Sequence, residues 1–341
     1  MEKPGLIDAM RTGLPHQRVR TVVDQYTALH GRGADDLRAN YMAMVNNYYD
    51  LVTDAFEFGW GQSFHFAPRR RGESFDASLE RHELFLADVL RLKPGMKVLD
   101  VGCGVGGPMR AIARASGASI VGVNNSAYQV ERGVKYNTAA KLDGLCSYLK
   151  ADFMSIPMPA ASFDAVYAVE ATCHAPDRTK LFREIFRLMK PGTDFAGYEW
   201  CLTPQYDARN PQHRAIKKGI EEGGALPGLS FEHEVVDALK AAGFQVIEAR
   251  DLADTSDPET PWWLPLSGRL SISGFRHTWP GRWLTRQATR VLELSKIIPE
   301  GSSAVAVFLN KGAEAMVRGG KTGIFTPMFF FHARKPGATS V

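Results

Sequence analysis

The sequence predicts an α/β protein built on a doubly wound, mostly parallel sheet of seven strands. Two observations carry this prediction. From residue 97 onward, short apolar runs of strand length alternate with segments of helical period, as in a parallel sheet covered by helices on both faces. The first run leads directly into a glycine-rich turn, DVGCGVGG at residues 100–107, which opens the next helical segment. A chain of 341 residues, 45% of them hydrophobic, can bury a full core.

The expected strands are apolar runs bounded by turn residues, and they span residues 97–101, 119–123, 147–153, 163–169, 195–200, 244–249 and 324–334. Helices are expected between them at residues 108–116, 128–141, 179–189 and 231–242. Three more helical patterns cover residues 35–50, 78–90 and 302–317. We therefore expect an N-terminal helical segment with an aromatic loop (residues 1–77), an α/β core (78–255) and a C-terminal, substrate-facing region with the last strand (256–341).

Composition excludes several classes of protein. The formal charge is +4, and the longest basic run is the three arginines at residues 69–71, so no nucleic-acid partner is expected. The four cysteines form no C-x-x-C pair and no metal-like spacing, which predicts reduced thiols in an intracellular protein without a metal site. The N-terminus lacks the apolar stretch of a signal peptide, and no apolar run is long enough to predict a membrane-spanning helix.

The glycine-rich turn predicts a cofactor site. Gly102, Gly104 and Gly106 let the backbone approach a ligand closely, and Asp100 stands two positions before the first of them. An acid here would repel a pyrophosphate, which argues against a nicotinamide dinucleotide. It suits a cationic ligand with an α-ammonium and a sulfonium. The expected ligand is S-adenosylmethionine (SAM).

Two further strand ends are expected at the same cofactor. Asn124 and Asn125 follow the second strand, where side chains reach ribose hydroxyls and where an acid is more usual. Asp152 and Phe153 close the third strand, where a carboxylate beside an aromatic ring can contact an adenine amino group. A helix cap is the alternative role for Asp152.

Several stretches resemble the sterol 24-C-methyltransferase family: GWGQSFHFAPR, GESFDASLERHE, LDVGCGVGGP, GVNN..YQ, DFM, FDAVYAVEATCHAP, YEW and IFTPM. The similarity runs from about residue 48 to residue 336. It implies a class I, Rossmann-like SAM-dependent methyltransferase with a C-terminal lipid-substrate region. It also implies methyl transfer to C24 of a Δ24 sterol, a homo-oligomer, and a cofactor role for Gln129 in GVNN..YQ.

The aromatic segment FEFGWGQSFHF (residues 56–66) fits this chemistry. An alkene that attacks a methyl sulfonium becomes a carbocation, so the site must exclude water and stabilise positive charge without offering a nucleophile. Aromatic faces do both. We expect Phe58 and Trp60 nearest the cation, whereas Phe56 and Phe66 fit a core position equally well.

His174, just past the end of an expected strand, and four further polar residues are candidates for proton removal, for anchoring a hydroxyl or for holding a water. They are His65, His82, Glu170, His174 and Glu199, of which Glu170 is also a cofactor candidate. Tyr198 and Glu199 end a strand and are expected to face the same pocket. Ser63, on the loop before the core, is expected to close over the SAM carboxylate.

The chain departs from the family pattern at four places. Phe58 replaces the second tyrosine of Y-E-Y-G-W-G, Leu84 replaces a histidine, and residues 126–127 and 220–225 also differ. These differences leave SAM use intact and bear on the exact substrate and on the number of methyl additions.

Contact with a lipid surface is expected because a sterol is almost insoluble in water. Trp262, Trp263, Trp279 and Trp283 lie near arginines and prolines, a composition suited to a membrane interface. Filling the pocket roof from inside is the alternative. The expected location is the endoplasmic reticulum membrane or a lipid droplet. A related activity on another isolated alkene, such as a linear triterpene or an acyl chain, and a non-catalytic lipid-binding role remain as alternatives.

Overall fold

The computed structural model describes residues 16–30, 34–267, 293 and 299–337. The chain divides into two compact units, each assembled from three separate stretches. Unit 1 contains Met1–Gly61, Leu202–Leu229 and Thr260–Phe325, and unit 2 contains Gln62–Cys201, Ser230–Glu259 and Thr326–Val341. These divisions differ from the expected boundaries at residues 77 and 255, since contacts rather than chain order define a unit. The three-segment division stays a prediction.

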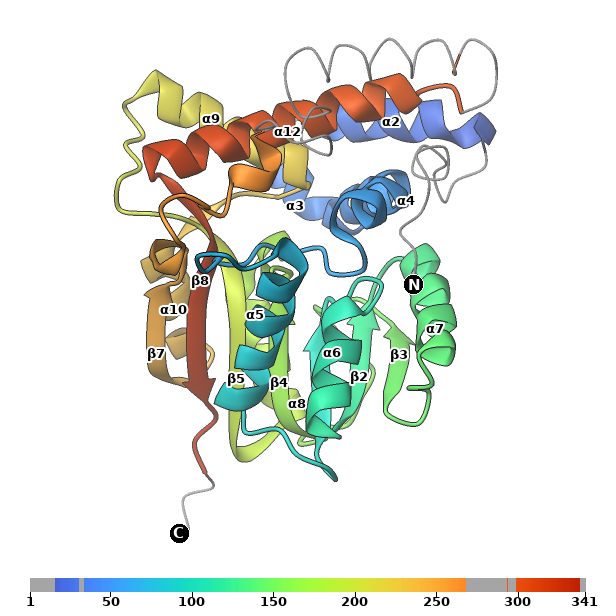
Figure 1. Cartoon of the computed structure of the whole chain (residues 1–341), viewed down its shortest axis with the longest axis vertical. Helices are drawn as coiled ribbons and strands as arrows, with labels where there is room; N and C mark the ends of the chain where they lie inside the picture. The colour runs from blue at the N-terminus through green and yellow to red at the C-terminus, as the bar shows by residue number, and fades with distance from the viewer. Residues whose placement is uncertain (1–15, 31–33, 268–292, 294–298, 338–341) are drawn as a thin grey trace. The chain divides into compact units, whose positions relative to one another are not determined.

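Unit 2 contains a sheet of order β3-β2-β1-β4-β5-β8-β7, with the short strand β6 paired to β5 (Figure 1). The strands are β1 (Lys97–Val101), β2 (Ser119–Asn124), β3 (Cys146–Lys150), β4 (Phe163–Val169), β5 (Met189–Leu202), β6 (Ser230–Phe231), β7 (Gln245–Asp251) and β8 (Phe325–Arg334). β1 pairs in parallel with β2 and β4, so the order reverses at β1. Such a switch point leaves a crevice at the carboxyl ends of the strands.

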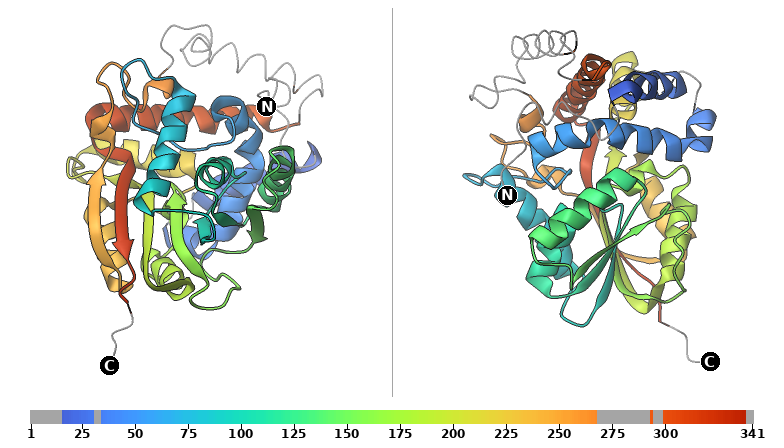
Figure 2. Two further views of the ribbon diagram at one scale, coloured as in Figure 1. Left: turned by 60° about the horizontal axis from the view of Figure 1, so that its bottom comes forward. Right: turned by 90° about the vertical axis from the view of Figure 1, so that its right-hand side faces the viewer.

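Helices cover both faces of this sheet. α5 (Phe75–Val89), α6 (Gly107–Ser116) and α7 (Ala127–Ala139) lie on one face, and α8 (Arg178–Leu188) and α10 (Glu232–Ala241) lie on the other (Figure 2). The core between sheet and helices contains fully buried side chains such as Leu99, Val166 and Phe195. The prediction of a doubly wound, mostly parallel sheet is thereby confirmed.

The strand predictions differ from the structure mainly at their ends. The third strand stops at Lys150 rather than at residue 153, because the chain turns there and the Asp152 carboxylate accepts a hydrogen bond from the amide of Met154 at 2.9 Å. The fifth strand is longer than expected and starts at Met189. β6 was not predicted, since two residues carry no period.

Unit 1 is helical in its described part. It contains α2 (His16–His30), α3 (Ala34–Ala39), α4 (Tyr41–Trp60), α9 (Pro211–Gly224) and α12 (Ser302–Thr322), with the 3-10 turn η3 (Leu264–Leu266). Two tyrosines of its core donate to carbonyl groups at the end of α9: Tyr26 to Glu222 at 2.5 Å and Tyr48 to Gly223 at 2.7 Å. They satisfy carbonyls that a helix end leaves without partners.

Two helix expectations need correction. The segment α9 was not predicted, because its apolar positions are few and glycines end it. The first part of the aromatic segment, residues 56–60, is the last turn of α4, whereas its glycines suggested no regular period. Gly59 is accommodated inside the helix, and Gly61 ends it at a φ of 73°.

Candidate active site

The glycine loop after β1 has the close-packed geometry of a ligand-binding turn. Gly102, Gly104 and Gly106 have φ values of 78°, 54° and 79°, which favour glycine. A Cβ on Gly102 would overlap the Cβ of Ala171, and one on Gly106 would overlap the hydroxyl of Tyr148. Glycine at these positions therefore permits the positive φ values of the turn, and at Gly102 and Gly106 it also leaves space for the side chains of Ala171 and Tyr148.

Asp100 lies near the end of β1 and is 2% exposed. Its Oδ2 accepts a hydrogen bond of 2.9 Å from the hydroxyl of Tyr167 on β4. Burial raises the pKa of Asp100 to about 7, against the lowering effect of this bond. A carboxyl of this kind gains most from a cation beside it, because an adjacent positive charge would restore its ionised form. The residues present therefore fit a sulfonium ligand with an α-ammonium group.

The other expected cofactor residues lie at the carboxyl ends of neighbouring strands. Asn124 is the last residue of β2, and its amide donates to the Oε1 of Gln129 on α7 at 2.8 Å. Asn125 follows it, and Ser126 caps α7 by accepting from the amide of Gln129. Asp152 lies in the turn after β3 with Phe153 beside it in sequence. The sheet thus brings the three strand ends to one edge, as predicted.

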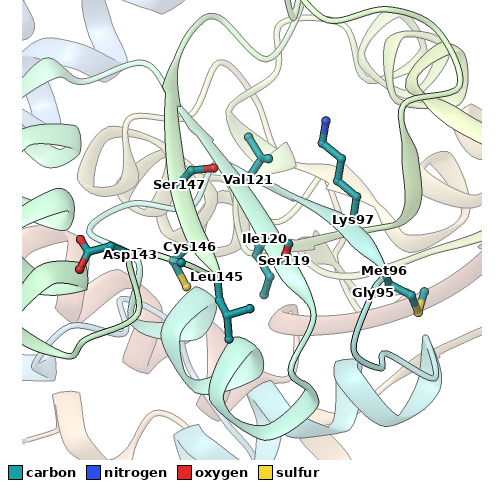
Figure 3. Close-up of a pocket in the computed structure, with 11 residues that line it drawn as sticks. Gly95, Met96, Lys97, Ser119, Ile120, Val121, Asp143, Leu145, Cys146 and Ser147 are labelled. Carbon is teal, nitrogen blue, oxygen red and sulfur yellow. The ribbon is translucent and has the colours of Figure 1, made fainter.

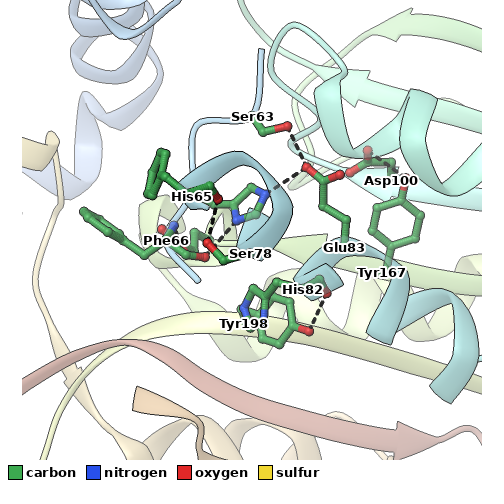
Figure 4. Close-up of polar contacts among 11 residues, drawn as sticks. Ser63, His65, Phe66, Ser78, His82, Glu83, Asp100, Tyr167 and Tyr198 are labelled. Atoms are coloured by element: carbon green, nitrogen blue, oxygen red, sulfur yellow. Dashed lines mark hydrogen bonds and ion pairs between the residues drawn. The ribbon is translucent and has the colours of Figure 1, made fainter. Parts of the chain in front are cut away.

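Residues 62–66 form a segment of unit 2 that we call the strap, and hydrogen bonds attach it to α5 and to the end of β4. Ser63 Oγ donates to Oε1 of Glu83 on α5 at 2.6 Å, and His65 Nε2 lies 3.0 Å from the same oxygen. Figure 4 shows both side chains directed at the Glu83 carboxylate, with Asp100 next to it. At the end of the strap, the amide of Phe66 donates to Glu170 Oε1 at 2.7 Å.

The geometry of His65 favours its charged form. Its Nδ1 lies 2.8 Å from the carbonyl of Phe66 and its Nε2 faces Glu83, so both ring nitrogens face acceptors. Burial alone would lower the pKa of His65, but the hydrogen bond and charge of Glu83 outweigh it, and the pKa is raised. An imidazolium with both N–H groups engaged has no free lone pair, so in this arrangement His65 acts as an ion-pair partner.

Glu170 fastens the strap to the end of β4. Its Oε1 accepts from the amide of Phe66, and its Oε2 accepts from the indole of Trp200 at 2.6 Å. Burial raises the pKa of Glu170 to about 8, although the charge of His65 and both hydrogen bonds lower it. Its φ of 51° is unusual for a residue other than glycine, and such strain is concentrated at functional sites.

Tyr198 and Glu199 do not face one pocket, which corrects the expectation. Neighbouring residues of a strand point to opposite faces of the sheet. Tyr198 stacks on the ring of His82 at 3.7 Å between centroids and donates to its carbonyl. Glu199 instead accepts from the hydroxyl of Thr172 and lies 3.6 Å from Arg178 Nε.

Two histidine candidates are buried in different settings. His82, on α5, is 1% exposed, and burial lowers the pKa of its ring well below the ordinary value, so the ring is neutral. His174 is 6% exposed in the 3-10 turn η1 (Thr172–His174), four residues after Glu170. The roles of both histidines stay a prediction.

The aromatic candidates Phe58 and Trp60 belong to α4 in unit 1. Residues two apart on a helix are separated by a rotation of about 200° around its axis, so they lie on nearly opposite faces. Phe58 and Trp60 therefore do not form one continuous aromatic surface. Phe56 and Trp60, four apart, do share a face, with ring centroids 6.1 Å apart. Both Phe58 and Trp60 are half-buried.

Sequence reasoning missed several polar residues. Asp54 and Glu57 are 5% and 1% exposed on α4, and Glu83 is 3% exposed on α5. The only sequence signal for Glu57 was its place among aromatic residues, where an acid is expensive to bury. Glu83 carried no such signal, because only the fold brings Ser63 and His65 to it.

A separate cavity lies at the opposite end of the strands. It has a volume of about 330 Å³ and is lined by residues at the starts of β1, β2 and β3, including Lys97, Ser119 and Cys146 (Figure 3). Active sites of open α/β sheets lie at the carboxyl ends, so this cavity is not the expected site.

In the described ranges no group of three or more His, Cys, Asp or Glu side chains is arranged to hold a metal ion. Among the same residues, no helix is both long and apolar enough to cross a bilayer.

The comparisons agree with the fold and the glycine loop. A family model described as "Methyltransferase domain" matches residues 99–196. Similar solved structures include the cyclopropane synthase MmaA2 of Mycobacterium tuberculosis (TM-score 0.65, 17% identity, 88% of this chain and 98% of that one). Another is the geranyl diphosphate C-methyltransferase of Streptomyces coelicolor A3(2) (TM-score 0.61, 17% identity, 86% and 98%). The protein is a class I SAM-dependent methyltransferase.

Further comparisons identify the family within this class of methyltransferases. A model described as "Sterol methyltransferase C-terminal" matches residues 272–337. The chain is 51% identical over 314 residues to cycloartenol-C-24-methyltransferase of Arabidopsis thaliana, covering 92% of this chain and 93% of that protein. It is 45% identical to sterol 24-C-methyltransferase of Yarrowia lipolytica, covering 87% and 80%. The chain belongs to the sterol 24-C-methyltransferase family.

Proposed function

We propose that this protein transfers the methyl group of SAM to C24 of a Δ24 sterol side chain in sterol biosynthesis. The observation that carries the proposal is the buried Asp100 at the glycine loop, placed next to a strap that hydrogen bonds hold along its length. The family relationship supports the sterol as acceptor, and the named activity of the Arabidopsis relative on cycloartenol supports that sterol type.

Residues of this chain account for cofactor binding and for exclusion of water. When bound, SAM supplies an electrophilic methyl group on a sulfonium. Asp100 would stabilise the positive charge of this ligand, Asn124, whose amide donates to Gln129, would contact its ribose hydroxyls, and the strap covers the glycine loop. Ser63 and His65 are held to Glu83, so a strap ordered in this way leaves less room for water.

The substrate becomes a tertiary cation after attack on the methyl group, and it must then lose a proton. We propose that aromatic faces of α4, Trp60 with Phe56 and separately Phe58, stabilise that charge. A neutral imidazole is the chemically suitable acceptor of the proton. His82, whose ring is neutral, is therefore a better candidate than His65, whose ring nitrogens both face acceptors, and His174 is a candidate from its place just after β4.

Products from purified protein test the proposal. The protein is incubated with SAM and with cycloartenol, lanosterol, zymosterol and a linear triterpene, and the lipids are analysed by mass spectrometry. We expect a gain of one methyl group, located at C24, with at least one sterol. Methylation of the linear triterpene alone would reject the sterol as acceptor.

We also propose a homo-oligomer and a peripheral contact with the endoplasmic reticulum membrane or a lipid droplet. Trp279 and Trp283 lie outside the described residues and are supported only by composition. Trp262 is 5% exposed and packs on Phe325 with centroids 5.8 Å apart, while Lys321 lies over Trp263. The structure thus gives Trp262 a packing role inside unit 1.

Liposome flotation separates these tryptophans. Trp262→Ala should lower the free energy of unfolding by about 3 kcal/mol, because a buried indole leaves a cavity, and should leave flotation unchanged. The double variant Trp279→Ala/Trp283→Ala should reduce flotation. Equal flotation of this double variant and the unmodified protein would contradict the membrane contact.

A further inference from the structure

Arg110 is a buried arginine in the first turn of α6, and the methyl-transfer chemistry described above does not use it. It is 4% exposed. Its Nη1 donates to the carbonyl of Val105 in the glycine loop at 2.8 Å and to Asn137 Oδ1 on α7 at 3.1 Å. Its Nη2 donates to Gln62 Oε1, the first residue of the strap, at 2.7 Å. One guanidinium therefore joins the glycine loop, α7 and the strap.

The three hydrogen-bond acceptors of this guanidinium are uncharged. Val105, Asn137 and Gln62 all present neutral oxygens to it, so these three bonds do not make a salt bridge. A buried charge is costly unless its hydrogen-bonding groups are satisfied, and the planar fork of arginine can satisfy several acceptors in fixed directions. The arrangement holds three segments in a defined geometry rather than neutralising a carboxylate.

Gln62 makes a second attachment through its backbone. Its carbonyl accepts from the amide of Gly107, the first residue of α6, at 3.1 Å. This bond occupies one of the N–H groups that a helix start leaves free. A Cβ on Gly107 would overlap the carbonyl of Gln62 and the Oγ of Ser63. The strap therefore packs directly on the backbone at the start of α6.

We propose that Arg110 is a positioning residue of the methyl transfer, which locks the strap to the glycine loop through the side chain of Gln62. The lock holds the start of the strap, while Glu83 holds Ser63 and His65 and Glu170 holds Phe66. Without it, the segment that covers the cofactor loop moves relative to that loop. The assignment to methyl transfer rests on the proposed function, whereas the lock itself rests on the contacts.

The variants remove one arm of the lock at a time in the full-length protein. Gln62→Ala removes the side-chain acceptor and keeps the backbone carbonyl. Gln62→Glu keeps an oxygen acceptor for Arg110 and serves as the conservative variant. Arg110→Lys replaces the fork by a point charge, and Arg187→Lys is its matched control, since Arg187 also donates to two loop carbonyls, of Ile156 and Met158.

Kinetics with saturating SAM and sterol give the first readout. Gln62→Ala and Arg110→Lys should lower kcat by about tenfold or more, because small displacements of positioning groups cost large factors in rate. The SAM dissociation constant, measured by calorimetry, should change by less than about threefold, and Gln62→Glu should recover most of kcat. Arg187→Lys should leave kcat unchanged. An unchanged kcat in Gln62→Ala, or an equal loss in Arg187→Lys, would overturn the proposal.

Hydrogen exchange gives a readout that needs no sterol. Residues 62–66 and the amide of Gly107 should exchange faster in Gln62→Ala than in the unmodified protein and in Gln62→Glu. Unchanged exchange would overturn the lock even if activity fell. Faster exchange in a protein that methylates no sterol would retain the lock and reject the proposed function instead.

Discussion

Two buried carboxyl groups, Asp100 and Glu170, determine how the protonation of this site responds to a cationic ligand. Asp100 and Glu170 are 2% and 7% exposed, and burial raises the pKa of Asp100 to about 7 and that of Glu170 to about 8. Glu83, also buried, accepts hydrogen bonds from Ser63 and His65. In the ligand-free protein the carboxyl groups of Asp100 and Glu170 therefore carry protons near neutral pH, and a cationic ligand is expected to displace them.

The affinity for SAM should depend on pH for this reason. Below pH 7 Asp100 carries a proton in the free protein, and SAM favours the ionised carboxylate. Binding then releases a proton, so affinity rises with pH, by up to about tenfold per unit for each proton released, and levels off above pH 8. Calorimetry at pH 6 to 9, in two buffers of different ionisation heat, measures both affinity and proton release.

Asp100→Asn supplies the control for this prediction. The variant should bind SAM more weakly and should lose the part of the pH dependence that Asp100 contributes. A profile that is flat from pH 6 to 8 in the unmodified protein would show that Asp100 does not meet the cation.

At the scale of elements, close backbone approach shapes unit 1. α9 and α12 contact each other where two glycines meet: a Cβ on Gly312 would lie 2.7 Å from the Cα of Gly223. Gly219 meets Ala315 in the same way one turn earlier on α9. Small residues thus set the separation of the two helices, and a side chain there must push them apart.

Gly312→Ala should therefore destabilise the protein. The added methyl group overpacks the contact, and we expect a loss of about 1–3 kcal/mol in the free energy of unfolding, despite the better helix propensity of alanine. Urea unfolding measures the loss. Gly144→Ala is the control, since nothing lies within 4 Å of its added Cβ, and it should be neutral or slightly stabilising. Equal stability of the two variants would mean that the helices separate without cost.

At the scale of the whole molecule, sequence order and spatial order diverge. β8 comes from the end of the chain and lies between β5 and β7 in the sheet. Its Phe331 is fully buried, with its ring 4.9 Å from that of Phe195 on β5. The last strand therefore completes the buried core of unit 2.

Truncation after residue 324 should abolish the cooperative fold of unit 2. Loss of β8 removes both the pairing partner of β7 and a buried aromatic layer. Far-UV circular dichroism during urea unfolding measures cooperativity, and Phe331→Ala is the comparison, with an expected loss of about 3–5 kcal/mol but a retained fold. A truncated chain that unfolds cooperatively and binds SAM would contradict the inferred role of β8.

Much of the fold was predictable because its signals are local. β1 and β4 match their expected ranges, and the glycine loop follows β1 as the motif indicates. The end of β3 was missed because the turn at Asp152 depends on a side-chain hydrogen bond. The helical state of residues 56–60 was missed because α4 continues through Gly59, although glycine is a weak helix former.

The site residues likewise fall into those that could be placed from the sequence and those that could not. Asp100, Asn124 and Asp152 could be placed at one edge from sequence, since parallel strands bring their carboxyl ends together. The expectation that Tyr198 and Glu199 share a pocket failed on the alternation of a strand. Glu83 and Arg110 were missed because nothing near them in the chain identifies their partners.

The sequence by itself determined the α/β class, the glycine loop with its acid, and the family to which the chain belongs. These properties lie in the order of neighbouring residues. Only the tertiary structure decided that one carboxylate holds Ser63 and His65, that Glu170 holds Phe66, and that Arg110 holds Gln62. These partners stand 20, 18, 104 and 48 residues apart, so no local pattern encodes them. Folding must bring them together before their charges and hydrogen bonds can act.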